Sequence, residues 1–131
     1  MNWKLFVKRI ALMLLAVFAA TLIDWAVHST SSRFYVEFEY YRNKVLFGTI
    51  WGLIGFFVFR RIRWVNNYKK LAVLVSLVIA ATLQAKYFFL GYDKFFVFLF
   101  FFLHFLMFLP PMLFVFKKFP RVFGVTSGKA P

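Results

Sequence analysis

Asp24 and His28 are the first residues whose types and spacing could do chemistry. They are four residues apart, so on a helix they lie on one face and can touch. A carboxylate beside an imidazole can relay a proton, orient a base or begin a metal site. Glu37 and Glu39 follow in the next segment and offer further oxygen ligands to a hard or borderline metal ion. This region is therefore a candidate for proton transfer or metal binding.

An ion pair explains Asp24 more simply than a metal site does. No second histidine stands at ligand spacing, and the sequence lacks the HExxH motif of zinc-dependent hydrolases. A carboxylate at the membrane interface that pairs with Arg33 or Arg42 needs no further ligand. We therefore expect no metal and no cofactor. We also expect no enzymatic activity, because the sequence has neither a nucleophile with a paired base nor a glycine-rich phosphate loop.

His104 is the second candidate, because it stands inside the apolar run LFFFLHFLMFLPPM. An ionisable group within a membrane span is a functional hypothesis by default. Pro110 and Pro111 follow it, lack amide protons, and deprive the carbonyls of Leu106 and Met107 of their helical donors. The pattern predicts a helix kink near a polar group at the membrane midplane, which is an arrangement found in transporters.

A structural role explains the same histidine with fewer assumptions. A transport site needs more than one buried polar anchor, and the sequence offers His104 alone near the middle of its span. We interpret it as a neutral polar pin that hydrogen-bonds to Ser76, Thr82 or Thr49 on a facing helix. Gln84 is interpreted in the same way, as a hydrogen-bonding group between helices.

Four apolar stretches must position these side chains, at residues 10–27, 45–59, 71–90 and 95–116. The chain has 131 residues, of which 63% are hydrophobic and 22 are Phe, an excess that favours a membrane protein over a water-soluble domain. A helix needs ~20 residues to span the hydrocarbon core, where every backbone amide must be paired within the protein. We therefore predict an all-α fold, an integral membrane bundle of four transmembrane helices whose second span is short.

The distribution of Lys and Arg sets the expected orientation. Twelve of the 17 basic residues fall before the first stretch, between the second and third, or after the fourth, whereas all four acids fall on the other side. The positive-inside rule then places both termini in the cytoplasm. The net charge of +13 therefore indicates no nucleic-acid binding. It indicates a belt of basic side chains on the cytoplasmic side that contacts anionic lipids. We assign this contact to Arg60, Arg61, Arg63, Lys69, Lys70, Lys117, Lys118 and Arg121.

Small residues recur at helical spacing in three of the stretches. Gly48, Gly52 and Gly55 share one face of the second stretch, and Gly48 with Gly52 forms a GxxxG motif. Small side chains let helix backbones approach closely in lipid, where no hydrophobic force drives association. Packing inside one bundle explains these stripes, and a dimer interface is the alternative. We assign helix packing to the three glycines and to Ala16, Ala20, Ala72, Ser76 and Ala80.

Three further segments complete the organisation. Residues 28–44 are rich in aromatic residues and alternate over 34–41, so we expect an extended, interfacial loop between the first two helices. Residues 1–123 form one domain, and the tail at 124–131 is expected to be cytoplasmic and disordered. Residues 1–19 also resemble a signal peptide, but the apolar run continues to Val27 and favours an uncleaved helix.

Two functions are compatible with this sequence. A non-enzymatic accessory or scaffolding subunit would dock in the bilayer onto another membrane protein or a second copy, through its glycine stripe or its Phe-rich fourth helix. A small homo-oligomeric transporter or channel would place its midplane site at His104 and the kink at Pro110 and Pro111. We favour the accessory subunit, as a multi-pass protein of the plasma (inner) membrane, because the buried polar anchors are few.

Overall fold

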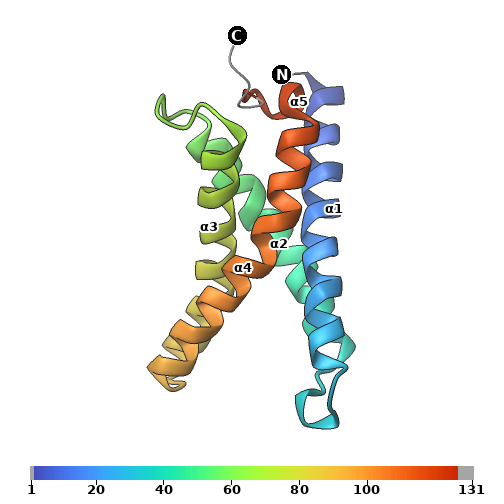
Figure 1. Ribbon diagram of the computed structural model, residues 1–131, viewed down its shortest axis with the longest axis vertical. Helices are drawn as coiled ribbons and strands as arrows, with labels where there is room; N and C mark the ends of the chain where they lie inside the picture. Colours follow the sequence, from blue (N-terminus) through green and yellow to red (C-terminus); the bar gives the residue numbers. More distant parts are fainter. Residues whose placement is uncertain (1, 127–131) are drawn as a thin grey trace.

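The computed structural model describes residues 2–126, and this part of the chain is all-helical, as the sequence predicts. The elements are α1 (Trp3–His28), η1 (Ser32–Phe34), α2 (Phe38–Phe59), α3 (Tyr68–Phe89), α4 (Lys94–Lys118) and α5 (Pro120–Phe123), of which η1 is one turn of 3-10 helix (Figure 1). The start of α1, the α2–α3 loop and α5 gather at one end, which we call the inner end. The α1–α2 and α3–α4 connections lie at the opposite, outer end.

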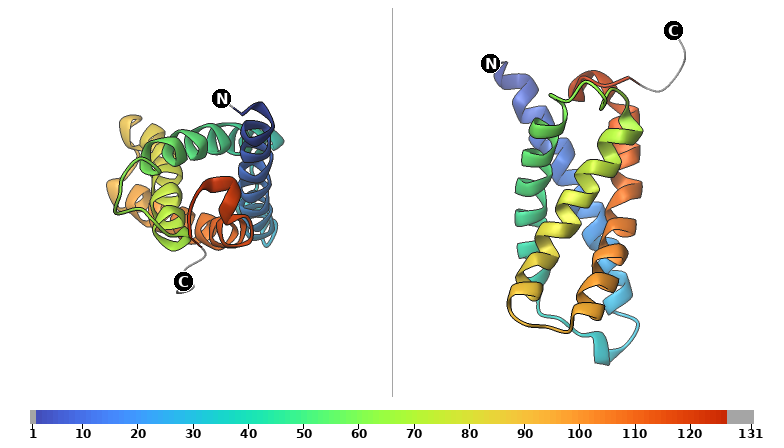
Figure 2. Two further views of the ribbon diagram at one scale, coloured as in Figure 1. Left: turned by 90° about the horizontal axis from the view of Figure 1, so that it is seen from above. Right: turned by 90° about the vertical axis from the view of Figure 1, so that its left-hand side faces the viewer.

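The long helices run side by side and close into a ring (Figure 2). Each of them packs against its neighbours in the chain, and α1 also packs against α4. Fully buried apolar side chains fill the ring from its middle to its inner end, and they include Met13, Val17, Phe56, Ile79, Phe108, Met112 and Phe116. The core is therefore continuous across all four long helices in this half of the protein.

Polar side chains define where three of the helices begin. The Asn2 side chain accepts a hydrogen bond from the amide of Leu5 at 3.2 Å and caps α1. Asn67 caps α3 by accepting from the amide of Lys70 at 3.0 Å. The Asp93 carboxylate caps α4 by accepting from two amides of its first turn. Each cap satisfies amides that have no partner within the helix.

The composition of the long helices indicates a membrane protein. Within residues 2–126, α1, α3 and α4 are long and apolar enough to cross a membrane. α2 does not belong to that set, because its outer turns carry Glu39, Arg42 and Lys44. Large apolar side chains cover the outside of the ring, among them Phe89, which is 82% exposed, and Phe95, which is 70% exposed. A water-soluble protein rarely exposes a continuous apolar surface of this kind.

The first turns of α2 differ from the sequence prediction. The alternation over residues 34–41 predicted an extended segment, but the helix begins at Phe38 and includes Tyr40 and Lys44. These two side chains are four residues apart and bond to each other at 2.7 Å on the face of α2 that meets the other helices. The prediction was wrong because the helix is favoured here by the contacts of Lys44 with Asp24 on α1 and His104 on α4, which the alternation of residues 34–41 does not reveal. The connection from α1 shrinks to residues 29–37, with η1 in its middle.

α4 runs through Pro110 and Pro111 as one helix. Figure 1 shows that it changes direction part-way along its length. The prolines cannot donate to the carbonyls of Leu106 and Met107, so this turn holds fewer backbone hydrogen bonds than its neighbours. Phe108 lies fully buried in the same turn. Side-chain packing therefore holds α4 together where backbone bonding is weakest.

α5 closes the inner end of the ring. The buried ring of Phe123 packs against Phe116 and Phe56, with centroid distances of 4.5 and 5.2 Å. Arg9 donates from Nε to the carbonyl of Val122 at 2.8 Å and ties α5 to α1. Aromatic packing and the hydrogen bond from Arg9 therefore hold α5 against the inner end.

The residues that follow α5 return to the α2–α3 loop. Gly124 adopts the left-handed conformation, with a φ of 67°, which a glycine takes without strain. The amide of Thr126 donates to the carbonyl of Asn66 at 3.2 Å, and the amide of Tyr68 donates to the carbonyl of Thr126 at 3.1 Å. The segment predicted as a disordered tail therefore begins as part of the packed inner end. Its residues 127–131 lie outside the described residues.

The glycine stripe of α2 faces its neighbours within the ring. A Cβ placed on Gly48 would lie 2.9 Å from Cγ1 of Val17 on α1, and one on Gly52 would lie 2.8 Å from Sδ of Met13. A Cβ on Gly55 would meet α3 at an ordinary 3.5 Å. The other small residues assigned to packing are also buried, namely Ala16, Ala20, Ala72, Ser76 and Ala80. Close approach of α1 and α2 thus depends on Gly48 and Gly52.

We predict that Gly48→Ala destabilises the fold and that Gly55→Ala does not. Val17 is β-branched and cannot move aside easily, so overpacking at Gly48 should lower the free energy of unfolding by about 1–3 kcal/mol. At Gly55 the same change should be neutral or stabilise by up to about 1 kcal/mol, because alanine is the better helix former. Unfolding in bicelles measures both. Equal effects at the two sites would contradict the tight contact at Gly48.

Candidate functional site

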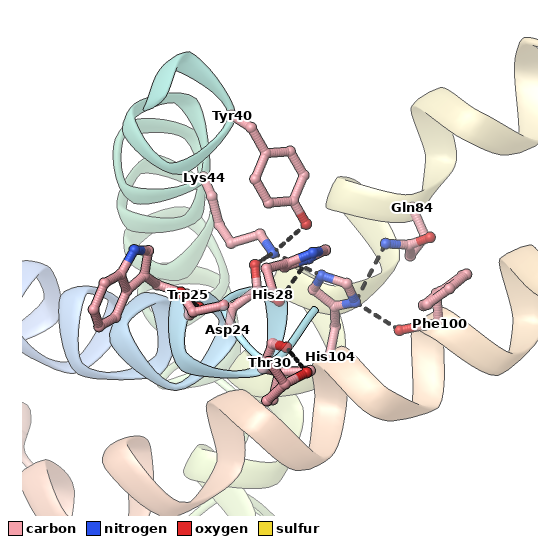
Figure 3. A network of polar contacts seen from close by, with 11 residues as sticks. Asp24, Trp25, His28, Thr30, Tyr40, Lys44, Gln84, Phe100 and His104 are labelled. Atoms are coloured by element: carbon pink, nitrogen blue, oxygen red, sulfur yellow. Dashed lines mark hydrogen bonds and ion pairs between the residues drawn. The ribbon is translucent and has the colours of Figure 1, made fainter. Parts of the chain in front are cut away.

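Each long helix contributes one buried polar side chain to a single cluster near the outer end. These are Asp24 from α1, Lys44 from α2, Gln84 from α3 and His104 from α4, with exposed fractions of 3%, 4%, 6% and 6%. Figure 3 shows their side chains pointing toward one another between the helices. We call these four residues, together with Tyr40 and His28, the polar cluster.

The ammonium group of Lys44 is the centre of the polar cluster. It donates to Oδ2 of Asp24, to the hydroxyl of Tyr40 at 2.7 Å and to Nε2 of His104 at 2.9 Å. An ammonium group has three protons, so these three acceptors use its whole donor capacity. Its nitrogen also lies 4.4 Å from the centroid of the Tyr40 ring, which adds a cation–π contact.

The contacts of His104 fix which of its ring nitrogens carries the proton. Nδ1 lies 2.7 Å from the carbonyl oxygen of Phe100, which can only accept, so Nδ1 is protonated. Nε2 then presents its lone pair to the Lys44 ammonium. The Gln84 amide approaches Nδ1 at 3.4 Å, but a protonated Nδ1 has no lone pair to offer a donor. Gln84 therefore keeps hydrogen-bonding capacity for another group.

His28 extends the cluster toward the outer end of α1. Its Nε2 lies 3.4 Å from Oδ1 of Asp24, the carboxylate oxygen that does not face Lys44. Its ring makes edge-on contacts with Tyr40 and Tyr41, at centroid distances of 5.6 and 6.2 Å. The Asp24 carboxylate is thus held between an imidazole at the outer end and an ammonium further inside.

The electrostatics of the cluster depend on pairing. An unpaired charge in a low-dielectric interior costs several kcal/mol, and a buried pair recovers this only when its remaining groups are hydrogen-bonded. Asp24 and Lys44 neutralise each other, and the other protons of the ammonium reach Tyr40 and His104. Replacing the whole pair by apolar residues often leaves stability unchanged. The contribution of Asp24 and Lys44 to the stability of the fold therefore does not explain why the sequence has a buried ion pair here.

A cavity of about 370 Å³ leads from the outer end to the polar cluster. α2 and α3 supply most of its wall, and Lys44, Gln84 and His104 contribute to its lining. Glu37, Glu39, Asn43, Lys86 and Tyr87 line it as well. Toward the inner end the cluster meets the fully buried core described above. Within residues 2–126, the cavity beside the cluster is therefore lined mainly by residues from the outer parts of α2 and α3.

A second hollow lies between the outer halves of α3 and α4. It measures about 700 Å³ and is lined by Ala81, Ala85 and several phenylalanines, with Lys94 in its wall. Gln84 lines this groove as well as the cavity on the other side of α3. The groove is apolar apart from these two residues, and its composition suits an alkyl chain or an apolar helix.

The structure brings together several residues that the sequence singled out. Asp24, His28, Gln84 and His104 belong to one cluster, and Glu37 and Glu39 line the cavity that leads to it. Among residues 2–126, no group of three or more His, Asp or Glu side chains is placed to hold a metal ion. Pro110 and Pro111 lie apart from the cluster, since Pro110 is six residues beyond His104 and therefore ~9 Å further along the helix.

The predicted partners of Asp24 and His104 were wrong. Asp24 bonds to Lys44, because the early start of α2 brings Lys44 to the inner face of the ring. Thr49 and Thr82 donate to carbonyls of their own helices, and the Ser76 hydroxyl has no hydrogen-bond partner among the described residues. The threonine hydroxyls bond within their own helices, and so does Nδ1 of His104, which bonds to the carbonyl of Phe100. Nε2 of His104 bonds to another helix, and its partner is Lys44.

Sequence reasoning missed Lys44 and Tyr40. Lys44 was counted as an outer-loop charge, so only the hydroxyls of Ser76, Thr82 and Thr49 were considered as partners of His104. The spacing of four residues between Tyr40 and Lys44 was the available signal, because it places a phenol beside an ammonium on one helical face. That signal required α2 to begin before Val45, where the continuous apolar stretch starts.

The predicted lipid-contact residues lie at the inner end. They occupy the end of α2, the α2–α3 loop, the start of α3, and the segment from the end of α4 into α5. Several stand over aromatic rings at that level, such as Lys70 over Trp64 at 4.8 Å and Lys118 over Phe114 at 5.5 Å. Arg9 and Arg60 both lie within 6 Å of the Phe57 ring centre. These basic groups therefore gather at the inner end beside aromatic side chains.

The comparisons with known proteins add no relative. No protein-family model, no curated protein and no solved structure matches this chain.

We predict strong energetic coupling between Asp24 and Lys44. Asp24→Leu and Lys44→Met should each lower the free energy of unfolding by about 3–5 kcal/mol, because each leaves a buried charge unpaired. The double variant should lose less than either single variant. Lys86→Met is the matched control, since Lys86 is exposed and its loss should cost under about 1 kcal/mol. Additive losses in the double variant would refute the coupling.

Proposed function

We propose that this protein is a small multi-pass membrane transporter whose substrate site is the polar cluster. The observation that carries the proposal is the convergence of buried polar groups from all four long helices on one point reached by a cavity. A transport site requires several such anchors, and the sequence alone had revealed one. Because residues of the outer end line the cavity, we assign the conformation described here to an outward-facing state.

The proposed arrangement in the membrane is four spans with both termini in the cytoplasm. α2 lies alongside the three apolar helices and has the length of a span, with 22 residues. The charge of Lys44 is compensated inside the ring by Asp24, which lowers its cost in lipid. The excess of basic residues at the inner end favours a plasma (inner) membrane orientation with contacts to anionic lipids.

An accessory or scaffolding role is the second candidate. The apolar groove between α3 and α4 favours it, because the groove could receive a helix of another membrane protein or of a second copy. The exposed phenylalanines of α4 offer further apolar surface for such a contact. We propose no catalytic activity for either candidate, since both Asp24 and His104 are engaged by the Lys44 ammonium.

Cysteine accessibility tests the transport proposal, and the natural sequence contains no cysteine that would interfere. We expect Gln84→Cys to react with a membrane-impermeant thiosulfonate from either face of the membrane, because a transporter exposes its site alternately to both sides. Asn43→Cys at the outer rim should react from outside only. Asn66→Cys in the α2–α3 loop should react from inside only, so these two variants calibrate sidedness.

The outcome separates the two candidates. Labelling of Gln84→Cys from the outer face alone would reject alternating access and leave the accessory role. If Gln84→Cys is labelled from neither side, water does not reach the polar cluster. That result would also reject alternating access and leave the accessory role. Native mass spectrometry of the protein extracted with its lipids then distinguishes a stoichiometric foreign subunit from a homo-oligomer.

A further inference from the structure

The surroundings of the Lys44 ammonium have the form of a binding site for a free amine. We infer that Asp24, Tyr40 and His104 form a receptor for small primary alkylammonium cations, and that Lys44 fills it in the conformation described here (Figure 3). This inference rests on the proposed transport function and names the substrate class of the same site.

The acceptor set matches the chemistry of a primary ammonium group. It combines a carboxylate oxygen, a phenol oxygen and an imidazole lone pair, one for each proton of the ammonium. The face of the Tyr40 ring adds a π-surface on which cations are stabilised. A quaternary ammonium has no N–H to donate, so this set discriminates against it by leaving three buried acceptors without a donor.

The cavity offers the room and the path that an external cation needs. Its volume of about 370 Å³ lies directly beside Lys44, which forms part of its wall. Phe47 and Leu83 supply apolar wall on which a short alkyl chain can pack. The carboxylates of Glu37 and Glu39 stand in the same lining and attract cations to it.

The carboxylates of Glu37 and Glu39 also offer the Lys44 ammonium an alternative ion-pair partner when another cation displaces it from Asp24. Its flexible four-carbon stem lets the ammonium leave Asp24 and turn into the cavity, where Glu37 and Glu39 supply counter-charge. The incoming ammonium then replaces the charge of Lys44 beside Asp24. Charge is therefore balanced in both arrangements, and the exchange needs no proton transfer.

Equilibrium dialysis of radiolabelled ethylammonium tests the inference on the full chain in lipid nanodiscs. Lys44→Ala empties the receptor, so we expect it to bind one ethylammonium per chain at saturation. The wild type should bind at least ~10-fold more weakly, because the tethered lysine competes at a high effective concentration. Asp24→Asn combined with Lys44→Ala should lose at least ~10-fold of the affinity of Lys44→Ala. An excess of tetramethylammonium should not compete.

A second comparison does not depend on the folding of Lys44→Ala. Glu37→Gln with Glu39→Gln in an otherwise wild-type chain should weaken ethylammonium binding severalfold, because displaced Lys44 loses its alternative partners. Lys117→Met is the control, because Lys117 is exposed at the inner end and does not line the cavity, and it should not weaken binding. No saturable binding to the wild type at concentrations up to ~1 M, or binding that Glu37→Gln with Glu39→Gln leaves unchanged, overturns the inference.

These results are distinguishable from those of the accessibility test. If Gln84→Cys is labelled from both faces but ethylammonium does not bind, transport stands and the substrate class is wrong. If ethylammonium binds but Gln84→Cys is labelled only from outside, the amine site stands and transport is rejected.

Discussion

A single buried ammonium group determines how the outer halves of α1, α2 and α4 meet. Lys44 is nearly inaccessible to solvent, and a charge in such surroundings is tolerated only when its protons find acceptors. Two of those acceptors stand on α1 and α4, and the third stands one turn earlier on α2 itself. Moving any of these helices by more than about an ångström would leave a proton without a partner, so the positions of α1, α2 and α4 depend on one another.

The glycines of α2 make that meeting geometrically feasible. Gly48 lies one turn from Lys44 toward the inner end, and it lets Val17 of α1 approach the α2 backbone closely. The same two helices therefore stand close together one turn further out, where Asp24 and Lys44 face each other. The contact between α1 and α2 thus has two successive parts. Small residues pack in the middle of the ring, and charges pair near its outer end.

The two halves of the ring differ in a way that suits movement at one end. The inner half is held by a continuous apolar core and closed by Phe123, whereas the outer half surrounds a cavity and a polar cluster. Pro110 and Pro111 leave the carbonyls of Leu106 and Met107 without backbone donors, and these carbonyls lie on α4 between His104 and the core residue Phe108. Turns of this kind bend more easily than regular helix, because fewer hydrogen bonds oppose the change. A bend in α4 would move His104 relative to Lys44.

Side chains on the apolar outer surface need no specific partners, unlike the polar side chains of the interior. The exposed phenylalanines of α4 need no protein partner in hydrocarbon, since lipid chains are as apolar as they are. They therefore carry little information about which helices touch. The polar residues of the spans carry more, because each must find a partner inside the protein. This explains why Asp24, Gln84 and His104 stood out in the sequence and also converge in space.

The sequence by itself determined the helical class, three apolar helices and the presence of polar groups within them, because these features depend on local composition and length. It predicted poorly where α2 begins, since the residues before Val45 are polar and aromatic and carry no helical apolar stripe. Only the tertiary structure decided that the helix starts at Phe38, and with it that Lys44 is a buried partner of Asp24 and His104. The physical reason is that a charge is stabilised by acceptors supplied from other helices, and contacts between distant segments leave no periodic trace in the chain.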